Sequence, residues 1–217
     1  MDIIQYLISF ILHIDVHLKE IIDMFGIWSY VILFLIVFVE TGVVIFPFLP
    51  GDSLLFAAGA FAATGAFHIA LLIVVFFIAA VLGDTLNYAI GNKIGTSIPQ
   101  DSWFGKIIDR EKMEKAEAFF NKHGGKTIVI ARFMPFIRTF APFVAGASSM
   151  HYRYFLTYNI VGAALWVGIC TMLGYLFGNI PIIKDNFSTV LIAIVFISVL
   201  PAIIAWLKNK FTANKPI

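Results

Sequence analysis

Five charged residues stand in stretches of the chain that are otherwise apolar, and they divide by sign along the sequence. The acids Glu40, Asp52 and Asp84 come first, and the bases Arg132 and Arg138 follow. A charge near the centre of a bilayer costs roughly 2.5–3.5 kcal/mol even on the mildest scale. These groups must therefore pair, line a wet cavity or be neutralised. Acid–arginine pairs that only fix packing are the plainer alternative.

The two arginines have the chemistry of an anion site. Arg132 and Arg138 are six residues apart, on either side of Pro135, so a break at the proline would let both side chains enter one pocket. Guanidinium forks match phosphate oxygens in bidentate fashion, and the amides at broken helix ends add donors. Carboxylates on the opposite side could exchange protons, because burial disfavours their charged form. The pattern indicates an anionic headgroup whose binding is coupled to protons.

Two apolar segments, 26–67 and 127–150, carry four of these five charges and contain residues that interrupt helices. Proline removes a backbone donor, and glycine lets the chain turn. The expected breaks are at Pro47, Pro50, Gly51, Pro135, Pro142 and Gly146. Irregular backbone at membrane depth persists only where protein or water satisfies it. Both breaks are therefore expected to face inward, towards each other, as re-entrant hairpins.

The composition around these segments is that of an all-α, polytopic membrane protein. Of the 217 residues, 60% are hydrophobic and 13% are charged, whereas a soluble domain has about 25% charged residues. One membrane domain, 1–217, is expected. Its expected parts are, in chain order, an amphipathic interfacial helix (1–25), a broken segment (26–67), a spanning helix (68–91), a polar amphipathic segment (92–126), a second broken segment (127–150) and two spanning helices (152–179 and 187–208).

Positive charge orients these elements in the membrane. Residues 93–126 hold seven Lys or Arg, and three lysines follow the last span. The positive-inside rule places segment 92–126 and the C-terminus in the cytoplasm. The N-terminus lies inside if the first broken segment crosses the membrane and outside if it turns back. The net charge of +2 does not suggest nucleic acid, and a single cysteine and scattered histidines suggest no metal or cofactor.

A faint internal repeat joins the two halves. The spans after the broken segments end alike, with Tyr, Gly and Asn at the same spacing and a period of 87: Tyr88, Gly91 and Asn92, then Tyr175, Gly178 and Asn179. Corresponding broken segments in two halves indicate a transporter's binding site, which makes the two tyrosines secondary candidates. The motifs Gly91-x-x-x-Gly95 and Gly174-x-x-x-Gly178 permit close helix contact, as internal packing or in a homodimer.

Three motifs resemble the DedA family of bacterial membrane proteins, which is related to the SNARE-associated or VTT-domain proteins of eukaryotes. They are "ETGVVIFPFLPGDSLL" (40–55), "GDTLNYAIGNKIG" (83–95) and "ARFMPFIRTFAPFVAG" (131–146). The resemblance covers nearly the whole chain, and the opening "HIDVHL" is similar to that of the family's namesake. It implies two facing re-entrant hairpins, lipid movement across the bilayer and dependence on the proton-motive force.

The resemblance also carries roles onto residues of this chain. It implies that Glu40 and Asp52 are an essential acidic pair and that Arg132 and Arg138 are an essential basic pair, while Asp84 matches only namesake-like members. The expected function is proton-driven recycling of undecaprenyl phosphate, the lipid carrier of cell-wall synthesis. The alternatives are a phospholipid flippase or scramblase, for example for phosphatidylethanolamine, and a proton or cation antiporter. A lipid phosphatase is less favoured, because no histidine lies within a broken segment.

Overall fold

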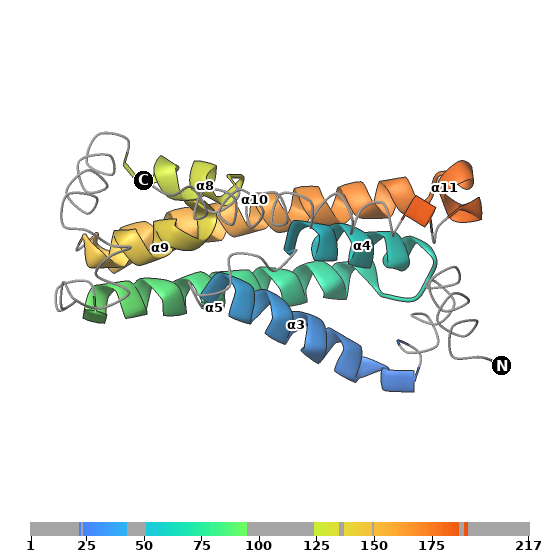
Figure 1. Cartoon of the computed structure of the whole chain (residues 1–217), viewed down its shortest axis with the longest axis horizontal. Helices are drawn as coiled ribbons and strands as arrows, with labels where there is room; N and C mark the ends of the chain where they lie inside the picture. The colour runs from blue at the N-terminus through green and yellow to red at the C-terminus, as the bar shows by residue number, and fades with distance from the viewer. Residues whose placement is uncertain are drawn as a thin grey trace, which may run out of the picture. The chain divides into compact units, whose positions relative to one another are not determined.

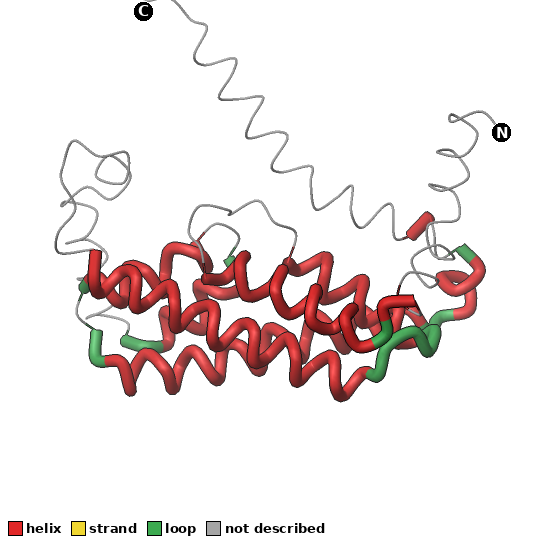
Figure 2. The backbone as a smooth tube through the Cα atoms, turned by 90° about the horizontal axis from the view of Figure 1, so that it is seen from below, coloured by secondary structure: helices red, strands yellow, loops and turns green. Residues whose placement is uncertain are grey.

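The described parts of the chain are helical. The computed structural model describes residues 22, 24–42, 51–94, 124–134, 137–148, 150–186 and 189–190. Among these residues there is no strand, as Figure 2 shows. The all-α prediction is confirmed for this part, while nearly all of the expected interfacial helix, most of the polar segment and nearly all of the third span lie outside it. The helices are α3 (Ile27–Gly42), α4 (Gly51–Ala63), α5 (Ile69–Ile94), α8 (Lys126–Arg132), α9 (Ile137–Ala147), α10 (Tyr152–Gly178) and α11 (Pro181–Asp185).

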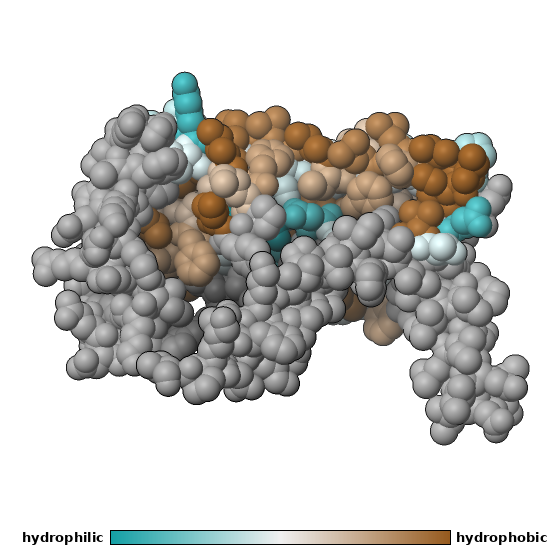
Figure 3. Space-filling model, turned by 45° about the horizontal axis from the view of Figure 1, so that its top comes forward, coloured by the Kyte–Doolittle hydropathy of each residue, from teal (hydrophilic) through white to brown (hydrophobic). Residues whose placement is uncertain are grey.

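Two of these helices, α5 and α10, are long and apolar enough to cross a membrane. They have 26 and 27 residues, so each is about 40 Å long at 1.5 Å per residue. A stripe of exposed aliphatic side chains follows α5 at intervals of three or four residues: Leu71, Val74, Ile78, Leu82 and Leu86. Apolar side chains cover much of the described surface in Figure 3. Such a continuous apolar surface suits lipid rather than water.

Both broken segments contain a helix, an interval and a second helix. In the first, α3 ends at Gly42 and α4 begins at Gly51, and Pro47 and Pro50 fall in the undescribed interval. In the second, α8 ends at Arg132 and α9 follows it after the interval that contains Pro135 (Figure 1). In the second segment the helix therefore ends before Pro135, while the breaks expected at Pro47, Pro50 and Pro135 themselves lie outside the described residues and stay predictions.

Two of the predicted breaks, however, are wrong. Pro142 and Gly146 lie inside α9, which continues to Ala147. Pro142 has no N–H for the carbonyl of Arg138, but the helix persists because it is buried on several sides. Gly146 has a packing role instead: a Cβ at this position would overlap the carbonyl oxygen of Tyr88 on α5.

Two tyrosine hydroxyls tie together the ends of the broken segments. The backbone N–H of His68 donates to the Tyr30 hydroxyl at 2.8 Å, across 38 residues. The N–H of Gly125 donates to the Tyr154 hydroxyl at 3.1 Å, across 29 residues. Each broken segment therefore returns close to where it starts, as a hairpin must. Whether the hairpins are re-entrant depends on the membrane, and this stays a prediction.

The chain forms two compact units. The first unit comprises residues 1–30, 48–72 and 170–217, and the second comprises 31–47 and 73–169. In the first unit, α4 packs against the end of α10. In the second unit, α9 packs against the end of α5, and the unit also contains most of α3, all of α8 and the first part of α10.

The helix crossing in the first unit is built on glycines. A Cβ at Gly59 of α4 would overlap the carbonyl oxygen of Thr171, and one at Gly174 of α10 would overlap that of Phe56. Gly178 lies against the backbone of Ala60 in the same way. The small-residue motif at 174–178 therefore serves packing within the chain, which was one of its two interpretations.

Candidate functional site

A pocket in the second unit brings together four of the five charged residues singled out in the sequence. It has about 270 Å³ of empty space, part of it open to the surroundings. Five helices contribute to its wall: α3, α5, α8, α9 and α10. The lining residues are Glu40, Thr41, Asp84, Arg132, Arg138, Thr139 and Trp166.

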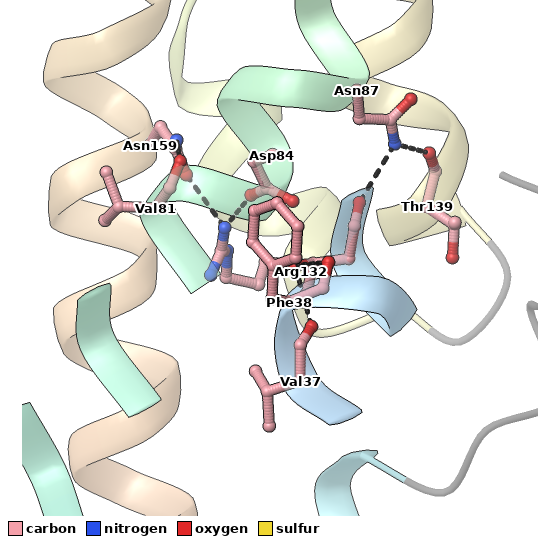
Figure 4. A network of polar contacts seen from close by, with 9 residues as sticks. Val37, Phe38, Val81, Asp84, Asn87, Arg132, Thr139 and Asn159 are labelled. Carbon is pink, nitrogen blue, oxygen red and sulfur yellow. Dashed lines mark hydrogen bonds and ion pairs between the residues drawn. The ribbon is translucent and has the colours of Figure 1, made fainter. Parts of the chain in front are cut away.

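Arg132, the last residue of α8, is buried in the wall of this pocket with 5% of its surface exposed. Its Nη2 forms an ion pair with Asp84 of α5 and donates a hydrogen bond of 2.8 Å to the side-chain oxygen of Asn159 on α10 (Figure 4). Its Nη1 is also buried and has no hydrogen-bond partner among the described residues. One edge of this guanidinium is therefore held by the protein, and the other has unused donors.

Arg138, in the first turn of α9, forms the second ion pair of the pocket, with Glu40 of α3. The arginine side chain is 15% exposed and the glutamate side chain 4%. Each pair joins two helices, α9 with α3 and α8 with α5. Buried ion pairs are weak evidence for stability, since apolar residues often serve as well. Two such pairs in one pocket therefore favour a functional interpretation.

Trp166 of α10 brings the two arginines to one place. The Cζ atoms of Arg132 and Arg138 lie 5.6 and 5.4 Å from the centroid of its ring. Both distances are within the range of a cation–π attraction, which offsets part of the repulsion between the two guanidiniums. Trp166 is itself 2% exposed, so the charges share a buried aromatic platform.

Asn87 of α5 holds the helix ends that carry Glu40 and Arg138. Its fully buried amide donates to the carbonyl of Thr41 at 3.1 Å and to that of Thr139 at 2.7 Å. Thr41 and Thr139 directly follow Glu40 and Arg138 in the sequence, and the bond from Asn87 to Thr139 is drawn in Figure 4. One amide therefore fixes the last turn of α3 and the first turn of α9 against α5.

Asp52, the remaining charged residue, lies in the first turn of α4, in the first unit. An acid in the first turn of a helix interacts favourably with the helix dipole. If the two broken segments face each other, Asp52 should approach a cavity shared with Arg138, and this stays a prediction. Among the described residues, no group of three or more His, Cys, Asp or Glu is placed to hold a metal ion.

The two tyrosines of the internal repeat lie in different units. Tyr88 donates to the carbonyl of Met150 and stacks on Phe155 at 4.5 Å, within the apolar core of the second unit. Tyr175 belongs to the part of α10 in the first unit, where its carbonyl accepts from Asn179 at 2.9 Å. Neither is among the residues that line the pocket.

The sequence alone did not predict a role in the site for Asn87 or Asn159, or the contact of Trp166 with the arginines. Trp166 is buried, as an aromatic residue inside an apolar helix commonly is, but it also lies beneath both arginines. A signal for the other two was available. Each is an amide inside an apolar spanning helix, where a polar side chain is costly unless it is bonded.

Comparison with known proteins gives the chain's relatives. A family model described as the VTT domain matches residues 49–176. Protein DedA of Escherichia coli K12 is 49% identical over 217 residues, which covers 99% of both chains. An uncharacterized membrane protein of Mycobacterium leprae is 45% identical over 78% of this chain and 76% of its own length. The inner membrane protein YqjA of Escherichia coli K12 is 36% identical over 70% and 69%. No solved structure matches.

Proposed function

The chain belongs to the DedA family of VTT-domain membrane proteins, and we propose that it translocates undecaprenyl phosphate across the bacterial inner membrane, driven by the proton-motive force. The names of these relatives state no substrate. The proposal therefore depends on the pocket. The observation that carries it is the placement of two guanidiniums over one buried indole ring, each with a carboxylate partner.

The charges of the pocket favour a phosphate monoester. The described lining residues include two guanidiniums and two carboxylates, which balance when no ligand is bound. A phosphate monoester carries about −1.5 to −2 charges at pH 7, enough to replace both carboxylates as the partner of the arginines. A phosphodiester carries about one negative charge and would replace only one of them. Undecaprenyl phosphate is a monoester, so its negative charge is large enough to replace both carboxylates.

The same balance couples the substrate to protons. When phosphate oxygens take over the arginines, Glu40 and Asp84 lose their counter-ions in a buried site. Burial without a partner disfavours the charged carboxylate, so both acids would take up protons as the anion binds. Release of the phosphate would return the acids to the arginines and free the protons. Asp52, the second acid that the family resemblance implies, would supply or receive protons in the same cycle.

The apolar surface of the spanning helices suits the rest of this substrate. Exposed aliphatic side chains follow α10 as they follow α5: Val161, Leu165, Ile169, Met172 and Leu176. An isoprenoid tail would stay in contact with these faces while the headgroup moves through the pocket between re-entrant hairpins. In this proposal segment 92–126 and the C-terminus lie in the cytoplasm, as positive charge indicates.

A phospholipid flippase is the second candidate, and one observation favours it. Both acids and arginines line the same pocket, so a zwitterionic headgroup such as phosphatidylethanolamine would find a partner for its ammonium group and for its phosphate. A phosphatase is less well supported, because the described lining residues include no histidine, the commonest general base, and both carboxylates of the pocket form ion pairs with arginines.

Translocation in proteoliposomes tests these proposals. The purified chain is reconstituted with undecaprenyl phosphate or with labelled phosphatidylethanolamine, each with and without a proton gradient. We expect movement of undecaprenyl phosphate that the gradient accelerates. Movement of phosphatidylethanolamine alone would favour the second candidate, and cation flux without lipid movement would favour an antiporter. Release of inorganic phosphate would identify a phosphatase.

Conservative replacement of the arginines is the sharper arm of this experiment. Arg132→Lys and Arg138→Lys keep the charge but lose the planar fork. Each should slow translocation at least about tenfold, because a charge-assisted hydrogen bond contributes about 1.5–3 kcal/mol. The control is Arg153→Lys on α10, since Arg153 is exposed and is not among the pocket residues. Full activity in both pocket variants would show that charge alone suffices and would contradict a phosphate site.

A further inference from the structure

We infer that Asn159 is a positioning residue of the anion site, which together with Gly162 and Trp166 forms a cradle on α10 that turns Nη1 of Arg132 towards a phosphate monoester. This inference rests on the proposed function and specifies how its site is built. It concerns binding rather than proton coupling, so it has a test of its own.

The contacts of Asn159 show that its amide is placed for the arginine. The side chain is fully buried in an apolar stretch of α10, where a polar group is costly unless it is bonded. Its Nδ2 donates to the carbonyl of Val81 on α5 at 3.1 Å. This bond fixes the orientation of the amide, so that Oδ1 accepts from Nη2 of Arg132 at 2.8 Å. An aliphatic residue would pack here without any need for these partners.

The two edges of the Arg132 guanidinium are then unequal. Nη2 has two hydrogens, and Asp84 and Asn159 accept from this atom. Nη1 is equally buried, yet no described residue accepts from it. A buried donor without a partner is unfavourable, and an oxygen of a bound ligand would supply one. The protein therefore uses one edge to hold the arginine and leaves the other for the ligand.

The remaining members of the cradle fix the rest of the side chain. Gly162 and Trp166 follow Asn159 by three and seven residues, which places all three on one face of α10. A Cβ at Gly162 would lie 3.6 Å from both Cδ and Nε of Arg132, an ordinary van der Waals distance, so this turn of α10 lies directly against the arginine side chain. The Trp166 ring lies 5.6 Å from its Cζ. Such preorganisation reduces the entropy lost when the ligand binds.

The cradle has a consequence for specificity. Nη1 of Arg132 has hydrogens to donate to a ligand oxygen, and the guanidinium of Arg138 lies over the same ring. A monoester has three charged terminal oxygens and can contact both arginines at once, whereas an alcohol offers a single neutral oxygen. Inorganic phosphate has the same oxygens but no apolar tail. Binding of headgroup and of tail is therefore separable with simple probes.

The experiment measures the Kd of the purified full chain in detergent for farnesyl phosphate, with farnesol and inorganic phosphate as comparison ligands. We expect Asn159→Leu to weaken farnesyl phosphate about tenfold, the loss of one hydrogen bond to a charged group. Asn159→Ala should give the same loss, although it differs in volume. The matched control is Asn179→Leu, an exposed amide near the end of α10, which should leave the Kd unchanged.

A double-mutant cycle separates positioning from general packing. If Asn159 acts through Arg132, then adding Asn159→Leu to Arg132→Lys should cost much less than it does in the native chain. Added to Arg138→Lys, it should cost its full tenfold. Equal costs in both backgrounds, or a loss that follows side-chain volume, would overturn the inference.

Failure of the proposed function has a different signature. Equal affinity of the native chain for farnesol and farnesyl phosphate would mean that the pocket binds no phosphate, and both proposals would be lost. Tight, phosphate-dependent binding that Asn159→Leu leaves unchanged would remove only the role of Asn159. Binding of inorganic phosphate as tight as that of farnesyl phosphate would assign the site to the free anion and would contradict the lipid substrate.

Discussion

The crossing of α4 and α10 in the first unit and the crossing of α9 and α5 in the second unit are two copies of one design. In each, the short helix supplies a phenylalanine carbonyl and, three residues later, a glycine. Phe143 and Gly146 of α9 follow Phe56 and Gly59 of α4 by 87 residues. This is also the period of the motif at the ends of the two long helices. The faint repeat in the sequence therefore reports a repeated packing geometry.

The long helices keep the design but change its register. Gly91 of α5 and Gly174 of α10 receive the two phenylalanine carbonyls, and the carbonyls of Tyr88 and Thr171 face the two glycines of the short helices. These equivalent residues are 83 apart, not 87. The difference of four residues is about one helical turn, so the short helix of the second unit crosses its partner one turn further along. The two crossings are related without being identical.

The two units differ more strongly in what they bury. In the first unit the buried polar side chains among the described residues are hydroxyls: Ser29, Ser53 and Thr171. In the second unit they include two acids, Arg132 and two amides. In the register of 87, Thr171 stands where the first half has Asp84. Glycine packing therefore forms the repeated frame, while the buried charged side chains among the described residues all lie in the second unit.

Loss of a charge in the second unit should have the largest effect. Asp84→Leu leaves the buried guanidinium of Arg132 without its counter-ion, and we expect the free energy of unfolding to fall by about 3–5 kcal/mol. Thermal unfolding in detergent measures the change. The double variant Asp84→Leu/Arg132→Met removes the pair as a whole and should recover most of the stability but no translocation. A single variant as stable as the native chain would mean that the pair is not desolvated.

The glycines of the two crossings should come next and should behave alike. Gly59→Ala and Gly146→Ala each place a Cβ onto a backbone carbonyl, so the helices must separate, at a cost of about 1–3 kcal/mol. Only Gly146→Ala should also weaken farnesyl phosphate, because α9 carries Arg138. The control is Gly168→Ala, where a Cβ meets nothing within 4 Å and where alanine should stabilise the helix by about 0.5–1 kcal/mol. Unequal losses at the two crossings would show that the geometry is not repeated.

Much of this arrangement could be predicted from the sequence, because its signals are strong ones. Charges in apolar segments are costly enough that pairing was expected, and Glu40, Asp84, Arg132 and Arg138 do share a pocket. A proline between the arginines indicated a break, and α8 and α9 are separate helices. Length and hydropathy were sufficient for α5 and α10.

The remainder depends on contacts between distant segments. Which acid meets which arginine is decided by helix positions, and the sequence left it open. Pro142 and Gly146 look like breaks by local propensity, yet burial of α9 maintains the helix through both. The role of Asn159 is invisible without Val81 and Arg132, which precede it by 78 and 27 residues.

Removal of a buried hydroxyl should change the free energy of unfolding least. Because each unit offers such a hydroxyl, this change tests directly how the units differ in their buried polar groups. The hydroxyl of Thr171 in the first unit is fully buried and has no hydrogen-bond partner among the described residues. Valine has nearly the same shape, so Thr171→Val should leave the free energy of unfolding unchanged or raise it by up to about 1 kcal/mol.

The matched change in the second unit should have the opposite sign. The Thr41 hydroxyl donates to the carbonyl of Val37 at 2.9 Å, so Thr41→Val should lower the free energy of unfolding by about 0.5–1.5 kcal/mol. Thermal unfolding of both variants under the same conditions measures the difference. If Thr171→Val cost as much as Thr41→Val, the first unit would also contain a bonded polar centre at the position that corresponds to Asp84. The chemistry would then be shared between the two crossings, and a second binding surface on α4 and α10 would have to be considered beside the first.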